Sequence, residues 1–74
     1  DDRLFEELRQ LRKKLADSQA IPPYIVLTDK TLHLLATLKP TTIEAFGEIS
    51  GIGEYKKEKY GKDFITVIRH VLKV

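Results

Sequence analysis

The chain contains no cysteine among its 74 residues, so neither a disulfide framework nor a thiolate metal site can stabilise it. A domain of this length buries only about 60% of the surface that its unfolded chain exposes, so its core is thin. Hydrophobic residues make up 42% of the chain, and no apolar run reaches the length that spans a membrane. We therefore expect one small domain held together by apolar side chains, mostly on helices. The missing initiator Met suggests a fragment of a longer protein.

Apolar residues recur at helical spacing along most of the chain, and no stretch alternates with a period of two. This pattern predicts helices over residues 3–19, from Thr28 or Asp29 up to Pro40, and over residues 54–60 and 63–72. Thr28 is the expected N-cap of the second of these helices. Thr41 and Glu44 have capping-box spacing, which predicts a short helix that includes Ile43 and Phe46 and ends at Gly47. The predicted fold is all-α, a compact bundle of five short helices. Its expected core contains Phe5, Leu8, Leu11, Leu35, Phe64 and Ile68.

Two kinds of residue interrupt the helical pattern. Pro22 and Pro23 remove two backbone donors and favour extended geometry in the residues before them, so we expect residues 21–27 to form a non-helical connection across the core. Gly51 and Gly53 predict a sharp turn into the next helix, and Gly61 occupies a C-cap position that would end it.

Sequence signatures of catalysis are absent. The chain has no phosphate-binding loop of the Walker type and no complete dinucleotide-binding glycine pattern. His33 and His70 fall opposite the apolar faces of their helices, and partner ligands for a metal are missing. We therefore expect no catalytic residue and no metal site.

The charge is nearly balanced overall, with a formal net charge of +2. Arg9, Arg12, Lys13 and Lys14 form a short basic cluster, although residues 1–20 have no net charge. Residues 51–74 carry six basic and three acidic side chains. These groups either contact phosphates or merely solvate helix faces, and the sequence leaves both interpretations open. We expect the stem of Arg12 to be partly buried with its head in solvent.

The segment Ser50-Gly51-Ile52-Gly53 leads into a helix that carries Lys56, Lys57 and Lys59. Glycines at a helix start expose backbone N–H groups that can hold a phosphate, as in a helix-hairpin-helix turn. The alternative is a tight turn that needs glycine only for its backbone angles. Glu54 favours the alternative, because its carboxylate would repel a phosphate.

Tyr24 follows the two prolines. A rigid loop can present an aromatic ring for stacking on a nucleic-acid base, a contact that contributes about 1–3 kcal/mol. The alternative is a half-buried tyrosine with a packing role.

Taken in order, these segments resemble an HRDC domain, the helicase-and-RNase-D C-terminal module, over essentially the whole chain (1–74). The most specific part is Pro22-Pro23-Tyr24 followed by apolar residues and then Asp29-Lys30-Thr31-Leu32. The other parts are Leu4-Phe5 to Arg12-Lys13, Ile49 to Gly53, and Lys59-Tyr60-Gly61-Lys62-Asp63-Phe64-Ile65. The Pro-Pro-Tyr segment is similar to that of bacterial RecQ helicases rather than to RNase D.

The resemblance implies an accessory, non-catalytic domain at the C-terminus of a RecQ-type DNA helicase in the cytoplasm, associated with the nucleoid. It implies no cofactor in this domain, with ATP and Mg²⁺ bound by the helicase motor upstream. Tyr24 matches the position of an aromatic residue that contacts DNA in bacterial relatives. The expected DNA-binding residues are Tyr24, Arg9, Arg12, Lys13, Gly51, Gly53, Lys56, Lys57 and Lys59.

Three functions follow as hypotheses. The first is a monomeric domain that binds DNA, preferably single-stranded, without a membrane partner. The second is a docking module for the helicase core of the same chain or for another protein. The third is the corresponding domain of an RNase D-type exonuclease, which the Pro-Pro-Tyr segment disfavours. Whether the two basic groups form one surface is left open by the sequence.

Overall fold

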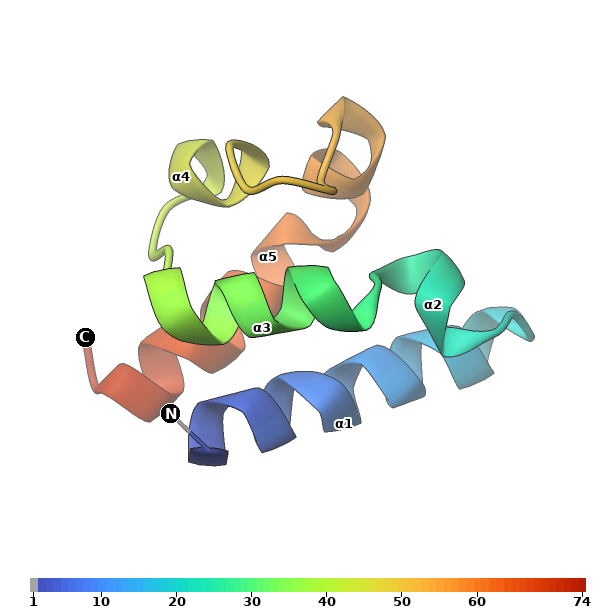
Figure 1. The fold of residues 1–74 in the computed structure, drawn as a ribbon, viewed down its shortest axis with the longest axis horizontal. Helices are drawn as coiled ribbons and strands as arrows, with labels where there is room; N and C mark the ends of the chain where they lie inside the picture. Colours follow the sequence, from blue (N-terminus) through green and yellow to red (C-terminus); the bar gives the residue numbers. More distant parts are fainter. Residues whose placement is uncertain (1) are drawn as a thin grey trace.

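A computed structural model describes residues 2–74, which form five α-helices (Figure 1). They are α1 (Asp2–Gln19), α2 (Pro23–Val26), α3 (Asp29–Leu38), α4 (Ile43–Gly47) and α5 (Glu54–Leu72). Helix α1 packs against α2, α3 and α5, while α4 packs against α5. Residues 2–74 contain no strand, so the predicted all-α fold is confirmed. None of the helices in this range is long and apolar enough to cross a membrane.

The core lies between α1, α3 and α5. Leu8, Leu35, Phe64 and Ile68, all predicted to be inside, are completely buried. The other two predicted core residues, Phe5 and Leu11, pack at its edge and are only partly buried. The Phe5 ring stacks on the exposed His33, with 4.3 Å between ring centroids.

Helix α2 contradicts the prediction that residues 21–27 are not helical. Pro22 is its N-cap and Pro23 is its first residue. The backbone N–H of a first helical residue has no partner within the helix, so proline loses no hydrogen bond there. The N–H of Leu27 donates to the carbonyl of Pro23, at 3.3 Å, and closes a single turn. The two prolines therefore begin a short helix rather than prevent one.

Helix α5 contradicts the prediction of two helices separated at Gly61. The helix is continuous over 19 residues, and Gly61 lies buried in its middle. A Cβ atom at Gly61 would lie 3.1 Å from Cδ1 of Ile43 and 3.4 Å from the Phe46 ring. The glycine thus permits the close approach of α4 to α5 and does not end a helix. The predicted total of five helices is correct only because α2 was missed and α5 was divided.

The caps of α3 and α4 are threonines. The backbone N–H of Thr31 donates to the Thr28 hydroxyl oxygen at 3.3 Å, as predicted for the start of α3. At α4 the predicted Thr41 cap is wrong by one residue, because the N–H of Ala45 donates to the hydroxyl oxygen of Thr42 at 3.1 Å.

The turn into α5 uses one of its two glycines for conformation. Gly51 has a φ of +94°, and a Cβ there would overlap the hydroxyl of Thr31. That hydroxyl is buried and donates to the carbonyl of Ser50 at 3.2 Å. Gly53 is the N-cap of α5 with a φ of −96°, and nothing lies within 4 Å of its Cβ position. The expectation that both glycines are needed for the turn therefore holds for Gly51 alone.

Two leucines on α3 test the position of the core. Leu35 is completely buried and Leu38 is 61% exposed. We expect Leu35→Ala to lower the free energy of unfolding by about 2–5 kcal/mol, since it opens a cavity. Leu38→Ala is the matched control and should change it by less than about 0.5 kcal/mol. Urea unfolding followed by circular dichroism measures both, and equal losses would mean that the inward face of α3 is misassigned.

The two glycines before α5 form a second matched pair. We expect Gly51→Ala to lower the free energy of unfolding by about 1–3 kcal/mol, because the backbone is strained and Thr31 is held by its own hydrogen bonds. Gly53→Ala should be nearly neutral, since its Cβ enters open space. Thermal unfolding of the two variants makes the comparison, and a larger loss at Gly53 would contradict this account of the turn.

Candidate nucleic-acid interface

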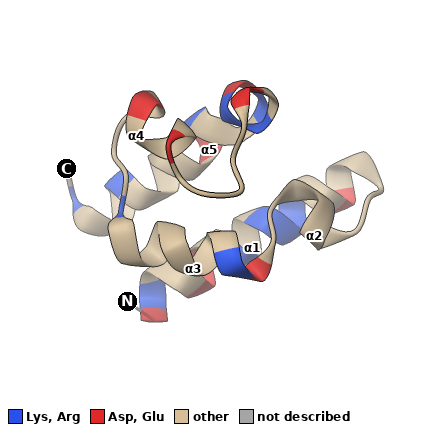
Figure 2. Cartoon of the chain, turned by 45° about the horizontal axis from the view of Figure 1, so that its top comes forward, with Lys and Arg blue, Asp and Glu red and all other residues tan. Residues whose placement is uncertain are grey.

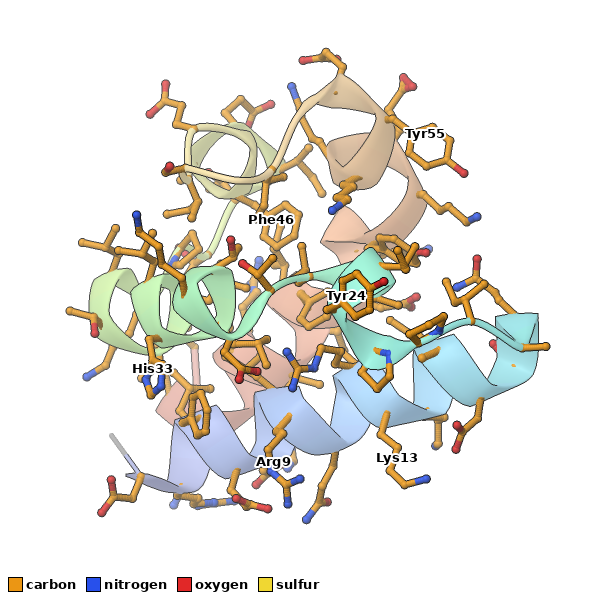
Figure 3. All side chains as sticks on the ribbon, turned by 45° about the vertical axis from the view of Figure 1, so that its right-hand side comes forward. Arg9, Lys13, Tyr24, His33, Phe46 and Tyr55 are labelled. Atoms are coloured by element: carbon orange, nitrogen blue, oxygen red, sulfur yellow. The ribbon has the colours of Figure 1, made fainter. Side chains whose placement is uncertain are left out.

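Tyr24 is presented by a turn that is anchored on its inner side. Its side chain is 63% exposed, which rules out the alternative of a half-buried packing residue. The next residue, Ile25, is 45% exposed, whereas Val26 and Leu27 after it are completely buried. The ring therefore projects from a short helix whose backbone is anchored by its buried neighbours (Figure 3).

Arg12 holds the far end of that turn. One of its guanidinium nitrogens, Nη1, donates to the carbonyl of Leu27 at 3.0 Å and lies 2.8 Å from Oδ1 of Asp29. The whole side chain is only 11% exposed, and Nε has no hydrogen-bond partner among the described residues. The expectation that its head reaches solvent is wrong, because the junction of α2 and α3 folds over it. In this structure Arg12 positions the Tyr24 turn.

Arg9 and Lys13 are exposed on α1, but each is paired with a carboxylate on the same helix. Arg9 pairs with Glu6, and Lys13 lies 2.9 Å from Asp17. The hydrogen bond from Arg9 lowers the pKa of Glu6 below its ordinary value and raises the pKa of Arg9. A phosphate that contacted Arg9 or Lys13 would have to compete with the carboxylate of Glu6 or Asp17.

Lys57 and Lys59, at the start of α5, also form side-chain contacts. Lys57 lies with its stem over Gly47 and its ammonium 3.5 Å from Glu54. Lys59 donates to the Tyr55 hydroxyl at 3.0 Å, a bond that raises the pKa of its ammonium. Lys59 has no carboxylate partner within the described chain.

Tyr55 is a candidate that the sequence analysis missed. Its ring is 68% exposed, and Lys59 Nζ lies 5.3 Å from the ring centroid. The signal in the sequence was the spacing of four residues between Tyr55 and Lys59, which places both on one helix face. An exposed aromatic ring can stack on a base, and a cation beside it can contact the phosphate of the same strand.

The two basic groups are not adjacent. In Figure 3, Arg9 and Lys13 project from α1 at the opposite side of the view from Tyr55, and Tyr24 lies between them. Acidic residues are interspersed with the basic ones on α1 and at the start of α5 (Figure 2). Gly51 and Gly53 lie in the turn before α5, where Glu54 occupies the first helical turn. The contacts expected between phosphate and the backbone amides of Gly51 and Gly53 stay a prediction.

The comparisons with known proteins agree with this architecture. The family model described as "HRDC domain" matches residues 1–68. RecQ helicases are similar to the chain, with 39% identity in Bacillus subtilis and 44% in Haemophilus influenzae, each over 93% of the chain. The ATP-dependent DNA helicase UvrD2 of Mycobacterium tuberculosis is 41% identical over the same share. The chain spans about a tenth of the length of these relatives: 12%, 11% and 10% respectively.

Among solved structures, the third HRDC domain of RecQ from Deinococcus radiodurans superposes with a TM-score of 0.91. It is 35% identical in sequence, and the match covers 96% of this chain and 93% of that one. The family model, the relatives and the fold all lead to one assignment: the chain belongs to the HRDC domain family and is similar to the HRDC domains of RecQ helicases.

Proposed function

We propose that the chain is a DNA-binding accessory domain of an ATP-dependent DNA helicase of the RecQ type. In this proposal Tyr24 stacks on a base of single-stranded DNA. The observation that carries the proposal is a tyrosine, 63% exposed, on a turn whose backbone is fixed by buried neighbours and by Arg12. A ring held in this way loses little conformational freedom on binding, so more of the stacking energy appears as affinity.

Single-stranded DNA is the preferred partner because its bases offer exposed π-faces that a duplex hides. Arg9 and Lys13 would contact phosphates on one side of Tyr24, and Lys56 and Lys59 would do so on the other. Arg12 is left out, since its guanidinium is buried and hydrogen-bonded. Tyr55 is added as a second exposed ring.

The relatives' names support the wider context. RecQ and UvrD2 are both named as ATP-dependent DNA helicases. The proposal assigns unwinding, with its ATP and Mg²⁺, to other parts of such a helicase and no catalytic step to this domain. The domain acts as a monomer in the cytoplasm at the nucleoid, where the helicase would take part in DNA recombination and repair. The RecQ type is preferred because of the Pro22-Pro23-Tyr24 segment.

The stacking role predicts different effects on affinity and on salt dependence. Tyr24→Ala should weaken binding to labelled oligothymidine by roughly 5- to 100-fold, the equivalent of about 1–3 kcal/mol for one stacked base. The slope of log K against log salt should stay near −3, as the four proposed phosphate contacts would give at about −0.7 each, because stacking releases no counterions. Fluorescence anisotropy at several salt concentrations measures both quantities.

Tyr24→Phe is the matched control for this experiment, since it keeps the ring and should keep the affinity. A folded Tyr24→Ala protein that binds as tightly as the wild type would refute the stacking role. If the wild type fails to bind oligothymidine even at low salt and high protein concentration, the docking-module hypothesis replaces DNA binding.

The pairing of Arg9 with Glu6 predicts a gain of affinity on removing the carboxylate. Glu6→Gln should remove the carboxylate that competes with phosphate for Arg9 and so strengthen binding to oligothymidine by up to about fivefold, the value of one exposed ion pair. Because the pKa of Glu6 is lowered, the pair persists at neutral pH and is lost only as the pH falls through that lowered value.

Glu44→Gln is the matched control, since it removes one exposed negative charge on α4, away from Arg9. Both variants are titrated with oligothymidine by the same anisotropy assay. Equal gains from Glu6→Gln and Glu44→Gln would show that net charge alone, and not Arg9, determines the effect.

A further inference from the structure

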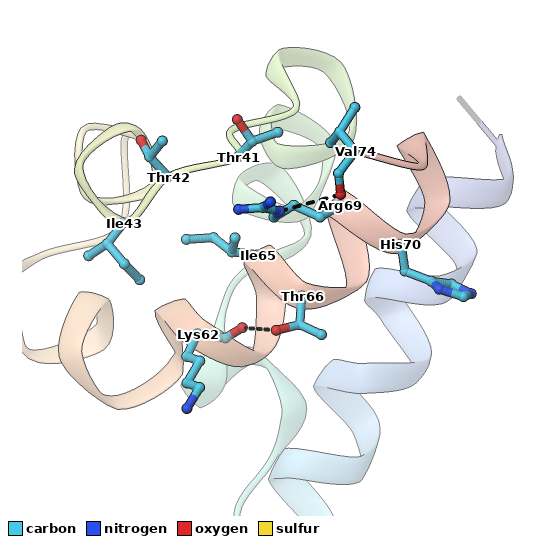
Figure 4. Close-up of a pocket in the computed structure, with 9 residues that line it drawn as sticks. All are labelled: Thr41, Thr42, Ile43, Lys62, Ile65, Thr66, Arg69, His70 and Val74. Carbon is cyan, nitrogen blue, oxygen red and sulfur yellow. Dashed lines mark hydrogen bonds between the residues drawn. The ribbon is translucent and has the colours of Figure 1, made fainter.

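A groove lies between the start of α4 and the second half of α5. Its volume is about 560 Å³, within the range of sites that hold small ligands. Thr41, Thr42 and Ile43 line one side, and Lys62, Ile65 and Arg69 line the other (Figure 4). None of these residues belongs to the candidate DNA interface.

The groove carries two basic side chains and no acidic side chain. No Asp or Glu lines it, and neither Lys62 nor Arg69 forms an ion pair within residues 2–74. Five cations elsewhere in that range are paired with carboxylates, namely Arg3, Arg9, Arg12, Lys13 and Lys57, and six others are unpaired. Lys62 and Arg69 are seven residues apart on α5, two helical turns or about 10 Å along its axis. Nε of Arg69 donates to the oxygen of Val74 at 3.5 Å, which leaves its other guanidinium N–H groups able to donate to a ligand (Figure 4). The groove therefore offers two separated positive charges beside apolar walls.

The walls between these charges are apolar. Ile43 is 37% exposed, Val74 is 67% exposed at the end of the groove, and the nearly buried Ile65 forms its floor. The Thr66 hydroxyl donates to the carbonyl of Lys62 at 2.7 Å and so is used within the helix (Figure 4). The oxygen of Thr42 accepts the N–H of Ala45, which leaves its O–H able to donate to a ligand.

We propose that this groove binds a short acidic peptide segment of another polypeptide. An apolar side chain of the peptide lies between Ile43 and Ile65, and its carboxylates pair with Lys62 and Arg69. Two features favour a peptide over nucleic acid. No Phe, Tyr or Trp lines the groove, and the imidazole of His70 lies at its edge, away from Ile43 and Ile65, so a base between the isoleucines finds no stacking surface (Figure 4). A phosphate backbone could pair with Lys62 and Arg69, but it would place polar groups against Ile43 and Ile65, which is unfavourable.

The experiment is a titration of the ¹⁵N-labelled 74-residue domain, whose core is complete in itself and whose solved relative matches it over 93% of that chain. The probe is a capped six-residue peptide of alternating Asp and Leu. The control peptides replace every Asp by Asn or every Leu by Ser, and oligothymidine is added in a separate series. We expect the Asp–Leu peptide to shift the amide signals of Thr42, Ile43 and Thr66, and both control peptides to bind at least about threefold more weakly.

Two variants complete the test. Arg69→Gln should weaken binding of the Asp–Leu peptide by roughly three- to fivefold, as expected for loss of one exposed ion pair. Lys14→Gln removes the same charge on α1, outside the groove, and should leave the affinity unchanged. The proposal is overturned if the peptide causes no shift in the groove at low salt, if Lys14→Gln weakens binding as much as Arg69→Gln, or if oligothymidine shifts these signals and the peptide does not.

Discussion

The buried guanidinium of Arg12 joins three parts of the domain. It reaches from α1 to the carbonyl of Leu27, at the end of α2, and to the carboxylate of Asp29, in the first turn of α3. A hydrogen bond from a charged donor contributes about 1.5–3 kcal/mol. The Asp29 side chain is 77% exposed, so the buried bond to the carbonyl of Leu27 contributes more than the ion pair does. Asp29 also interacts favourably with the N-terminus of its helix. The direction in which α2 presents Tyr24 thus depends on a residue in another helix.

The thirteen basic residues are offset by eleven acidic ones, and five of the cations within residues 2–74 form an ion pair with a carboxylate. On α1 the carboxylates stand three or four residues from the cations, so each pair forms within one helix. Such exposed pairs contribute little to stability, but they reduce the field that phosphate would feel. The proposed interface would therefore depend on the shape and position of its aromatic rings more than on charge.

Much of the fold follows from local rules that the sequence displays. The apolar stripe of α1, the Thr28 cap of α3 and the core positions of Leu8 and Ile68 were predicted correctly because each depends on residues within one helix. The errors at Pro23 and Gly61 arose where a residue known as a helix breaker occupies a position that a helix tolerates. At Gly61 the reason lies in α4, whose approach no local pattern reveals.

The candidate site was predictable to a smaller degree. The ion pairs on α1 could have been found from their spacing, and so could the neighbouring positions of Tyr55 and Lys59. The burial of Arg12 could not, because its partners are 15 and 17 residues away and meet it only when α2 and α3 fold over α1. The groove beside α5 was also hidden, since it combines residues at the start of α4 with residues in the second half of α5, which meet only because the chain turns back between the two helices.

Because α5 is continuous through Gly61, the charges at its two ends are held far apart. Lys59 and Arg69 are ten residues apart on one rigid helix, about 15 Å along its axis. This separation is nearly two Debye lengths at physiological ionic strength, so counterions largely screen each charge from the other. A helix broken at Gly61 could have brought the two charges together. The unbroken helix instead keeps them as separate local fields, and a ligand held at one end leaves the potential at the other almost unchanged.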